Sequence, residues 1–223
     1  MKKIFLLFGA NGNLGKAAVD YFLTQNYDEY FIFSRKPIDI YPAKNVNQII
    51  VEDLTKEINV RKAFQNVNSG KGNIYFLFST IGGYSGGQTI AETSIEEWNR
   101  LVSINLTSAL LISKHFMKLV QDSSGGTICF TSASSGLEPK KNNAIYGLTK
   151  NGLNFLVKSL SLEGAEINLT ANAVAPYIID TEENRQWAKD ISMMVSPKTI
   201  CETVQKIFLN WQNVSGEIVQ EFD

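Results

Sequence analysis

The stretch IFLLFGANGNLG, residues 4–15, decides the fold of this 223-residue chain. Its first five residues form a continuous apolar run, typical of a central parallel strand covered on both faces. Glycines follow at every third position, and residues 14–25 then predict a helix. Glycine permits a tight turn, and a helix N-terminus offers free N–H groups to an anion. This order predicts a dinucleotide site, with the pyrophosphate held by Gly9, Asn11, Gly12, Asn13, Leu14 and Gly15.

Strand-like and helix-like segments alternate along the rest of the chain. Strands are predicted at 4–8, 30–34, 48–51, 74–79, 127–131, 169–174 and 216–220. Helices are predicted at 14–25, 56–68, 95–120 and 143–163, and from Ser196-Pro197 to Trp211. The pattern predicts an α/β fold: a Rossmann-type, doubly wound parallel sheet of about seven strands with helices on both faces. Because no linker or repeat interrupts it, we expect one domain over residues 1–223.

Composition excludes several classes of protein. The formal net charge is −1, so nothing in the charge predicts binding to nucleic acid or to an anionic membrane. No apolar run approaches the roughly 20 residues that span a bilayer. Cys129 and Cys201 lie far apart without a CxxC motif, which favours a reducing, cytoplasmic location. His115 is the only histidine, so we expect no metal site and place His115 at the surface or an interface.

The end of the second predicted strand carries cations. Ser34 is followed by Arg35 and Lys36, where an acidic residue would bind a ribose 2′-hydroxyl. Two cations suit a 2′-phosphate, so the sequence predicts NADP(H) in preference to NAD(H). The alternative is a solvated basic turn. After the third strand, Asp53 and Leu54 are expected to contact the adenine.

A glycine-rich loop follows the fourth predicted strand, at residues 80–87. Gly82 and Gly83 suit a backbone that approaches a flat cofactor closely, and Tyr84 is expected at the edge of a substrate pocket. The alternative is a flexible solvent loop. In the helix predicted next, Asn105 falls among apolar positions and needs hydrogen-bond partners. It could hold a water or a backbone carbonyl beside Lys150, or be a satisfied core residue.

Tyr146 and Lys150 are separated by one turn of the helix predicted at 143–163 and so share a face. A free phenol has a pKa of about 10, and a neighbouring ammonium favours the phenolate. We therefore expect Lys150 to lower the pKa of Tyr146, so that the phenol relays a proton near neutral pH. The alternative is an ordinary amphipathic helix. Pro176 ends the sixth strand, and residues 178–185 are predicted to form a loop.

Together these motifs resemble the short-chain dehydrogenases/reductases. The resemblance covers nearly the whole chain and includes Gly9, Gly12, Gly15, Asp53, Asn105, Tyr146, Lys150, Pro176, Thr181 and Gly216 in family-like order. It implies an NAD(P)H-dependent oxidoreductase. Tyr146 would donate the proton, Lys150 would bind the nicotinamide ribose, and Asn105 would hold a water. Pro176, Ile178 and Thr181 would lie near the carboxamide. The resemblance also implies a homodimer or homotetramer built on the two long helices.

The chain departs from the family in its GxxGxxG spacing, in Ile81-Gly82-Gly83 where the family usually has Asn-Ala-Gly, and at one catalytic position. The catalytic serine usually found there is Ala133, with Ser132 and Ser134 on either side. This replacement, and the loop Gly-Gly-Tyr-Ser-Gly-Gly at 82–87, resemble the dihydropteridine reductase branch. That resemblance implies hydride transfer to a flat conjugated ring such as a quinonoid dihydropteridine, bound near Tyr84, Ala133 and Tyr146. Arg35 differs from this branch, whose members typically carry an acidic residue there. Two alternatives are a carbonyl reductase that uses Ser132 or Ser134, and a cofactor-binding sensor without turnover.

Overall fold

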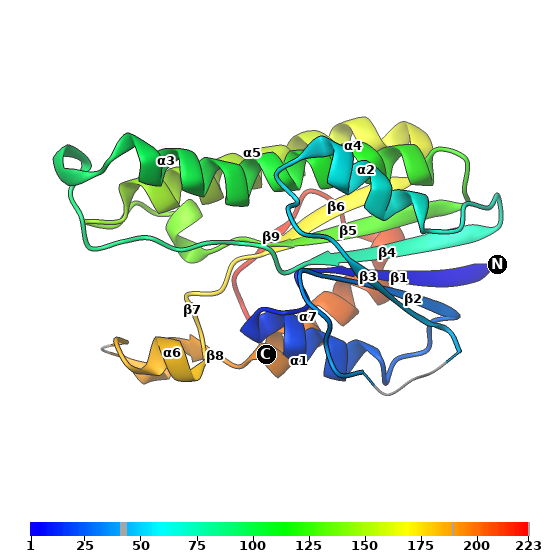
Figure 1. The fold of residues 1–223 in the computed structure, drawn as a ribbon, viewed down its shortest axis with the longest axis horizontal. Coiled ribbons are helices and arrows are strands. Elements are labelled where there is room, and N and C mark those ends of the chain that lie inside the picture. The colour runs from blue at the N-terminus through cyan, green and yellow to red at the C-terminus, as the bar shows by residue number, and fades with distance from the viewer. Residues whose placement is uncertain (41–43, 189, 223) are drawn as a thin grey trace.

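The computed structural model describes residues 1–40, 44–188 and 190–222. Parallel strands form a seven-stranded sheet in the order β3-β2-β1-β4-β5-β6-β9 (Figure 1). The strands are β1 (Lys2–Phe8), β2 (Glu29–Ser34), β3 (Val46–Ile50), β4 (Asn73–Ser79), β5 (Gly125–Thr131), β6 (Leu169–Val174) and β9 (Ile218–Val219). The chain builds outward from β1 toward β3 and then returns to build outward from β4. The predicted doubly wound sheet is therefore confirmed.

Helices cover both faces of the sheet (Figure 1). One layer holds α2 (Glu57–Gln65), α3 (Ile95–Val102), α4 (Ser108–Val120) and α5 (Ala144–Gly164), and the other holds α1 (Asn13–Phe22) and α7 (Pro197–Leu209). Strand β1 shows why both layers are needed. Its Ile4, Leu6 and Phe8 belong to the core under α2, α4 and α5, whereas Phe5 and Leu7 belong to the core under α1 and α7. Burying both faces explains the continuous apolar run.

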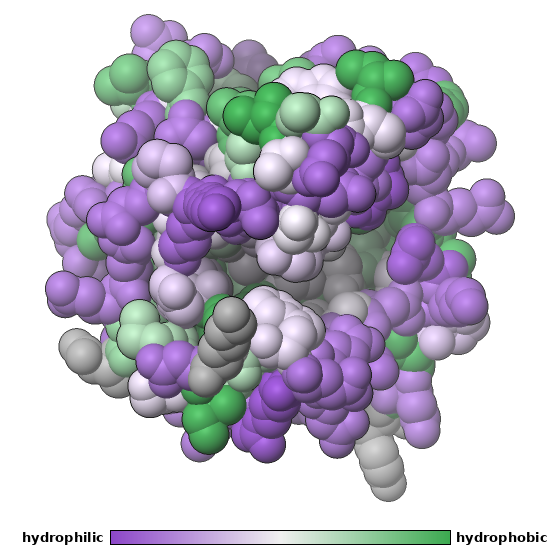
Figure 2. Space-filling model, turned by 90° about the vertical axis from the view of Figure 1, so that its left-hand side faces the viewer, coloured by the Kyte–Doolittle hydropathy of each residue, from purple (hydrophilic) through white to green (hydrophobic). Residues whose placement is uncertain are grey.

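The carboxyl ends of the strands lie at one edge of the molecule. Beyond this edge a second, two-stranded sheet pairs β7 (Ile178–Ile179) with β8 (Met194–Val195), and α6 (Glu182–Arg185) lies between these strands in sequence. Figure 2 views this edge and shows the surface hollowed between the two layers. Strand order reverses between β1 and β4, and ligands of such sheets bind outside the carboxyl ends at that reversal.

Several predicted boundaries were wrong. The helix predicted over 95–120 is interrupted by a π-helical turn at Ser103–Thr107. The segment 178–185, predicted as a loop, contains β7 and α6. Helix α7 ends at Leu209 rather than Trp211, and β9 spans only Ile218–Val219 instead of 216–220. Strand β3 begins two residues earlier than predicted, at Val46. Short edge strands and hydrogen bonds within loops leave little periodicity for sequence reasoning to detect.

His115 was predicted at the surface or an interface, and this was wrong. It lies on α4 and is 7% exposed. Its ring stacks on Phe64 with centroids 6.0 Å apart, and its Nε2 lies 3.6 Å from a carboxylate oxygen of Glu57. Burial lowers the pKa of His115. Helix α2 covers it, and the sequence gives no sign of which helices are neighbours.

Candidate active site

Two cavities open at the carboxyl edge of the sheet, with volumes of about 320 Å³ and about 400 Å³. They share Thr80, Ile81 and Gly82 at the end of β4, so they adjoin there. The smaller cavity contains Tyr146 and Lys150, and the larger contains Gly9, Gly12 and the basic turn. The two ends of the predicted site therefore meet in one crevice, as a cofactor lying across the strand ends requires.

The glycine turn is packed too tightly for side chains at Gly9 and Gly15. Gly9 has φ +95°, in the left-handed region, and a Cβ added to Gly15 would collide with the carbonyl oxygen of Gly9. Gly12 is the N-cap of α1, whose first turn contains no acidic residue. This backbone turn therefore leads directly into a helix N-terminus, the kind of place at which anions bind.

Asn11 shapes the basic turn beside this cradle. Its Oδ1 accepts hydrogen bonds from the backbone N–H of Arg35 at 2.6 Å and of Lys36 at 3.0 Å. Its Nδ2 donates to the carbonyl oxygen of Lys36 at 3.1 Å. These three bonds fix the backbone of the turn after β2, and Arg35 lines the larger cavity.

The remaining adenosine-side residues also line the larger cavity. Asp53 accepts hydrogen bonds from the N–H and hydroxyl of Thr55, which lower the pKa of its carboxyl. Leu54 lies beside it in the wall. Ser34 is buried, and its Oγ has no hydrogen-bond partner among the described residues. An orphaned buried hydroxyl in a cavity wall fits a ligand that supplies the missing partner. The residues present thus fit an adenine dinucleotide.

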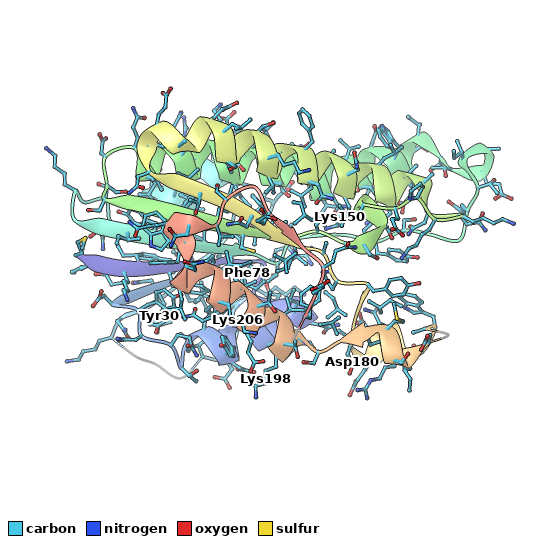
Figure 3. The ribbon with its side chains drawn as sticks, turned by 180° about the vertical axis from the view of Figure 1, so that it is seen from behind. Tyr30, Phe78, Lys150, Asp180, Lys198 and Lys206 are labelled. Atoms are coloured by element: carbon cyan, nitrogen blue, oxygen red, sulfur yellow. The ribbon has the colours of Figure 1, made fainter. Side chains whose placement is uncertain are left out.

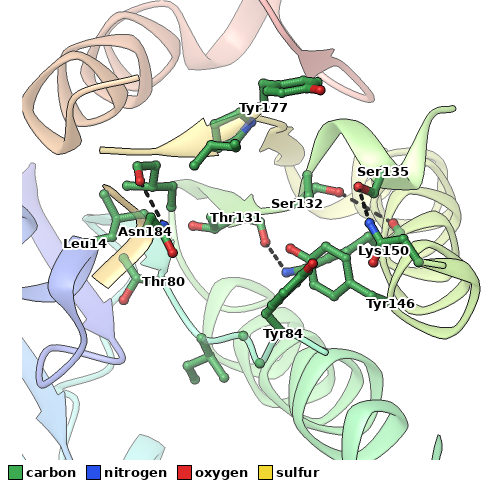
Figure 4. A pocket seen from close by; sticks show the side chains of 18 of the residues that line it. Leu14, Thr80, Tyr84, Thr131, Ser132, Ser135, Tyr146, Lys150, Tyr177 and Asn184 are labelled. Atoms are coloured by element: carbon green, nitrogen blue, oxygen red, sulfur yellow. Dashed lines mark hydrogen bonds between the residues drawn. The ribbon is translucent and has the colours of Figure 1, made fainter. Parts of the chain in front are cut away.

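Tyr146 and Lys150 both line the smaller cavity (Figure 4). Lys150 is 3% exposed, and its Nζ donates to the carbonyl oxygen of Thr131 at 2.8 Å. Burial lowers the pKa of Lys150 to about 8. Seen from behind, Lys150 of α5 lies toward the same end of the molecule as Asp180 in the segment after β7 (Figure 3). The shared helix face that the spacing predicted is therefore present.

The expected lowering of the pKa of the Tyr146 phenol is not found. The pKa of Tyr146 is raised rather than lowered, first by burial and then by the neighbouring Tyr84. The Lys150 Nζ lies 5.8 Å from the centroid of the Tyr146 ring and is engaged with Thr131. Removal of the phenol from water therefore outweighs the nearby charge. Tyr146 holds its proton at neutral pH in this structure.

Asn105 joins the glycine-rich loop to α5. It lies in the π-helical turn, is 2% exposed, and accepts from the N–H of Gly83 at 2.8 Å. Its Nδ2 donates to the carbonyl oxygen of Gly83 at 3.0 Å and to Thr149 Oγ1 at 2.9 Å. Asn105 thus bonds to a backbone carbonyl and has partners for both its oxygen and its nitrogen, which agrees with two of the predicted alternatives. The clamp holds Gly82 so close to Lys150 that an added Cβ would lie 3.0 Å from the Nζ.

The serines around Ala133 point to different partners. Ser132 lines the cavity, but its buried Oγ donates to Asn154 Oδ1 at 2.6 Å, so its hydroxyl proton is engaged. Ser134 Oγ accepts from the Lys140 ammonium at 3.0 Å. Ala133 itself lines the cavity, and so does Ser135, whose Oγ accepts from Asn143 Nδ2 at 2.9 Å. Ser135, which was not predicted, leaves its own hydroxyl proton available.

Aromatic rings form the outer wall. Tyr84 packs edge-to-face on Tyr146, with centroids 5.0 Å apart, and lies parallel to Trp187 with centroids 5.9 Å apart. Tyr84 is 54% exposed and Trp187 is 52% exposed. Tyr84 therefore lies at the rim of the pocket, as expected, and such exposed rings suit contact with a flat ligand.

The segment after β6 closes the other side. Pro176 and Ile178 line the smaller cavity, as does Leu14 at the start of α1. Thr181 does not line either cavity, because its hydroxyl caps α6 by accepting from the N–H of Asn184 at 3.2 Å. Asn13 Nδ2 donates to Glu183 at 3.3 Å, which joins α6 to the glycine turn.

Sequence reasoning missed other residues of the smaller cavity. They are polar or aromatic and come from the approach to α5 and the segment after β6: Ser135, Lys140, Asn143, Tyr177, Asn184 and Trp187. The approach to α5 could have been found, because it joins the end of a parallel strand to the helix that carries Tyr146. Nothing in the local sequence marks Trp187. Among the described residues, no cluster of His, Cys, Asp and Glu could hold a metal ion.

The sequence is similar to that of several known reductases. Residues 3–192 match the family model described as short chain dehydrogenase. A tropinone reductase homologue of Arabidopsis thaliana is 30% identical over 80% of this chain and 70% of its own. Carbonyl reductase family member 4 of Xenopus laevis is 27% identical over 85% and 81%. A dihydropteridine reductase of Dictyostelium discoideum is 24% identical over 85% and 80%.

Solved structures share the fold. ElxO with NADP bound superposes with a TM-score of 0.82 at 22% identity, covering 99% of this chain and 97% of its own. A gluconate 5-dehydrogenase of Burkholderia cenocepacia, in complex with NADP and tartrate, gives a TM-score of 0.82 at 16% identity, covering 99% and 93%.

Fold and crevice together define an NAD(P)-dependent oxidoreductase. The chain belongs to the short-chain dehydrogenase family. This membership favours an enzyme over the sensor considered from the sequence. No helix among residues 1–40, 44–188 and 190–222 is long and apolar enough to cross a membrane.

Proposed function

We propose that the protein is an NADPH-dependent reductase of flat conjugated rings, with a quinonoid dihydropteridine as the model substrate. The observation that carries this proposal is Ala133 in the cavity wall, facing a site rimmed by Tyr84, Tyr146 and Trp187. A serine hydroxyl there would stabilise the oxyanion of a reduced ketone. A conjugated ring spreads the charge that a hydride brings and does not need that donor.

The residues of the crevice divide the work between them. A nicotinamide held in the crevice would supply the hydride. The cradle at Gly9, Gly12 and Gly15 would hold its pyrophosphate, and Lys150 lies where it can bind the ribose beside Gly82. Tyr146 keeps its proton at neutral pH because burial raises its pKa, so its phenol oxygen can donate that proton to the reduced ring. Asn105 holds the loop that carries Gly82 and Gly83 against α5.

The test is oxidation of NADPH in the presence of quinonoid dihydropterin generated in the assay. We expect turnover by the wild-type protein and none by Tyr146→Phe, which keeps the ring but removes the proton. Folded protein that binds NADPH yet shows no turnover above the uncatalysed rate would remove this proposal.

A carbonyl reductase is the second candidate, and Ser135 favours it. Its hydroxyl lies in the cavity wall, accepts from Asn143, and is free to donate to a carbonyl oxygen. If Ser135 is the oxyanion donor, Ser135→Ala lowers kcat on ketones by about 10²-fold, and Ser132→Ala and Ser134→Ala change it little. An equal effect of all three changes would contradict a specific role for Ser135.

We also propose that NADPH is preferred over NADH. Arg35 lines the adenosine-side cavity, and the adjoining surface hollow contains Lys16 and Lys36 together with Asp20 and Asp39. Arg35 and Lys36 follow directly on β2, and two cations at that turn suit a 2′-phosphate. We expect Arg35→Ala to weaken NADPH binding by about tenfold or more and to leave NADH binding nearly unchanged. Titration of both cofactors by fluorescence measures this, and equal losses for the two would contradict it.

Finally, we propose a homodimer or homotetramer that works in a reducing cytosol. Leu148, Phe155 and Leu162 recur every seven residues along α5 and are 58%, 74% and 79% exposed, and Leu110 of α4 is 55% exposed. Such a row of exposed apolar side chains is typical of an interface. Sedimentation at micromolar concentration should show an oligomer that Phe155→Glu dissociates. Cys129 and Cys201 are free and buried, which suits a reducing compartment.

A further inference from the structure

The smaller cavity carries positive charge and no negative charge. Its charged lining residues are Lys140 and Lys150, and no Asp or Glu of the described chain lines it. Lys150 is accounted for by its bond to Thr131 and its place beside Gly82. The reductase proposed above gives Lys140 no role, although its partly buried ammonium faces the same space.

The contacts of Lys140 stabilise its ammonium without neutralising it. The Nζ lies 3.7 Å from the centroid of the Tyr177 ring and donates to Ser134 Oγ at 3.0 Å. A ring face attracts a cation but carries no net charge. An ammonium has three donors, and within the described chain Ser134 accepts the one hydrogen bond that Lys140 is seen to donate. The Lys140 ammonium therefore keeps unused N–H donors and a charge that no carboxylate neutralises.

The nearest acidic residue in sequence does not supply the missing partner. Glu138 lies two positions before Lys140 and is exposed, and both residues line a neighbouring hollow, but Glu138 does not line the cavity itself. No ion pair joins Lys140 to any carboxylate in the part of the chain that the structure describes. Lys140 lacks an ion pair such as the one that Lys114 makes with Glu57 at 2.6 Å, and unlike Lys114 it lines the cavity.

The geometry of this wall points to a substrate with a negative charge. We propose that the cavity binds a flat ring carrying an acidic group, such as a carboxylate or sulfonate, with the ring beside Tyr84 and Tyr146 and the acidic group at Lys140. Tyr177, which lines the same cavity, and Ser134 hold the ammonium in place. This inference rests on the proposed reductase function, because it assigns the second half of the same pocket.

Isatin and isatin-5-sulfonate are a suitable pair of probes, since both are flat conjugated dicarbonyl compounds and differ by one negative charge. Their binding to the complex with NADP⁺ is followed through fluorescence quenching, because Trp187 lies in the cavity wall. Their reduction by NADPH is measured in parallel. The variants are Lys140→Met, Lys140→Arg, and Lys141→Met as the control, since Lys141 is the exposed neighbour outside the cavity wall.

We expect the wild-type protein to bind the sulfonate about tenfold more tightly than isatin. Lys140→Met should abolish this preference without weakening the binding of isatin, whereas Lys140→Arg and Lys141→Met should keep it. The preference should weaken as salt is added. Absence of a charge preference in the titration, or its survival in Lys140→Met, overturns the inference. If the binding preference follows Lys140 but neither NADPH assay shows turnover, with isatin or with quinonoid dihydropterin, the anion site stands and the proposed reductase function is the part that fails.

Discussion

Replacing Asn105 by alanine tests whether the clamp on the glycine-rich loop positions the active site. The side chain satisfies the N–H and the carbonyl oxygen of Gly83 and bonds to Thr149 Oγ1, at 2.8, 3.0 and 2.9 Å. Thr149 keeps its bond to the carbonyl oxygen of Tyr146, so it loses little. The two backbone groups of Gly83 lose their partners in a partly buried place.

The magnitude follows from those two groups. A buried polar group without a partner costs roughly 1–3 kcal/mol, and water can reach part of this loop. We therefore expect Asn105→Ala to lower the free energy of unfolding by about 2–4 kcal/mol. Activity should fall further than this loss explains under conditions where the variant is fully folded, because Gly82 is no longer held beside Lys150. The expected sign is a rise in KM for the cofactor together with a fall in kcat.

Urea unfolding followed by circular dichroism gives the stability, and steady-state kinetics at saturating substrate gives the KM for NADPH. Asn66→Ala is the matched control, because Asn66 is an exposed asparagine at the end of α2 that bonds to Lys62. Its change in unfolding free energy should stay within about 0.5 kcal/mol. An Asn105→Ala protein that is as stable as the control and has an unchanged KM would falsify the clamp.

Three further predictions follow from the same geometry. First, kcat/KM for reduction should fall as pH rises through about 8. Lys150, with its pKa lowered to about 8, loses its charge there, whereas Tyr146, with its pKa raised, keeps its proton. A pH profile that rises through 8 contradicts this prediction. Second, Glu183→Gln should tighten NADPH binding a few-fold at low salt and hardly at all at high salt, because the Glu183 carboxylate contacts Asn13 where the pyrophosphate would lie. Equilibrium titration at both salt concentrations measures this change in affinity. Weaker binding by the variant would count against the prediction. Third, Ala133→Ser should raise turnover of ketones by about tenfold or more and leave that of a quinonoid dihydropterin nearly unchanged, since the new hydroxyl would line the cavity. The assay compares both kinds of substrate. An equal gain for the two would show that the missing hydroxyl does not set substrate choice.

Patterns repeated along the chain predicted the fold well. Apolar runs such as residues 4–8 and 74–79 gave the buried strands, and glycines at 9, 12 and 15 gave the first turn. These signals are local, because a strand buried on both faces must be apolar along its length. Boundaries failed where the determinants are not local, as in the π-helical turn that places Asn105 against Gly83.

Candidate site residues were predictable where they lie next to the end of a strand, and harder to predict where they come from a distant segment. Tyr84, Ala133 and Lys150 follow or face the ends of β4 and β5 and lie in one cavity. Trp187 reaches that cavity from a segment beyond the sheet. The proposed role of Lys140 depends on its contact with Tyr177, which the sequence does not reveal. Such meetings depend on tertiary contacts between distant segments, which spacing within one segment does not encode.

The proton of Tyr146 shows how spacing and energetics separate. An i,i+4 pair predicts that Lys150 shares a helix face with the phenol, and the structure agrees. Spacing cannot predict that the ammonium turns to the carbonyl oxygen of Thr131, or that burial dominates the pKa of the phenol. The consequence has a direction. A phenol that keeps its proton suits the reductive reaction, in which Tyr146 must give a proton, better than the oxidative one, in which it must accept one. Burial of Tyr146 therefore suits reduction at neutral pH, and burial of Lys150, which lowers its pKa to about 8, should weaken that reaction in alkali.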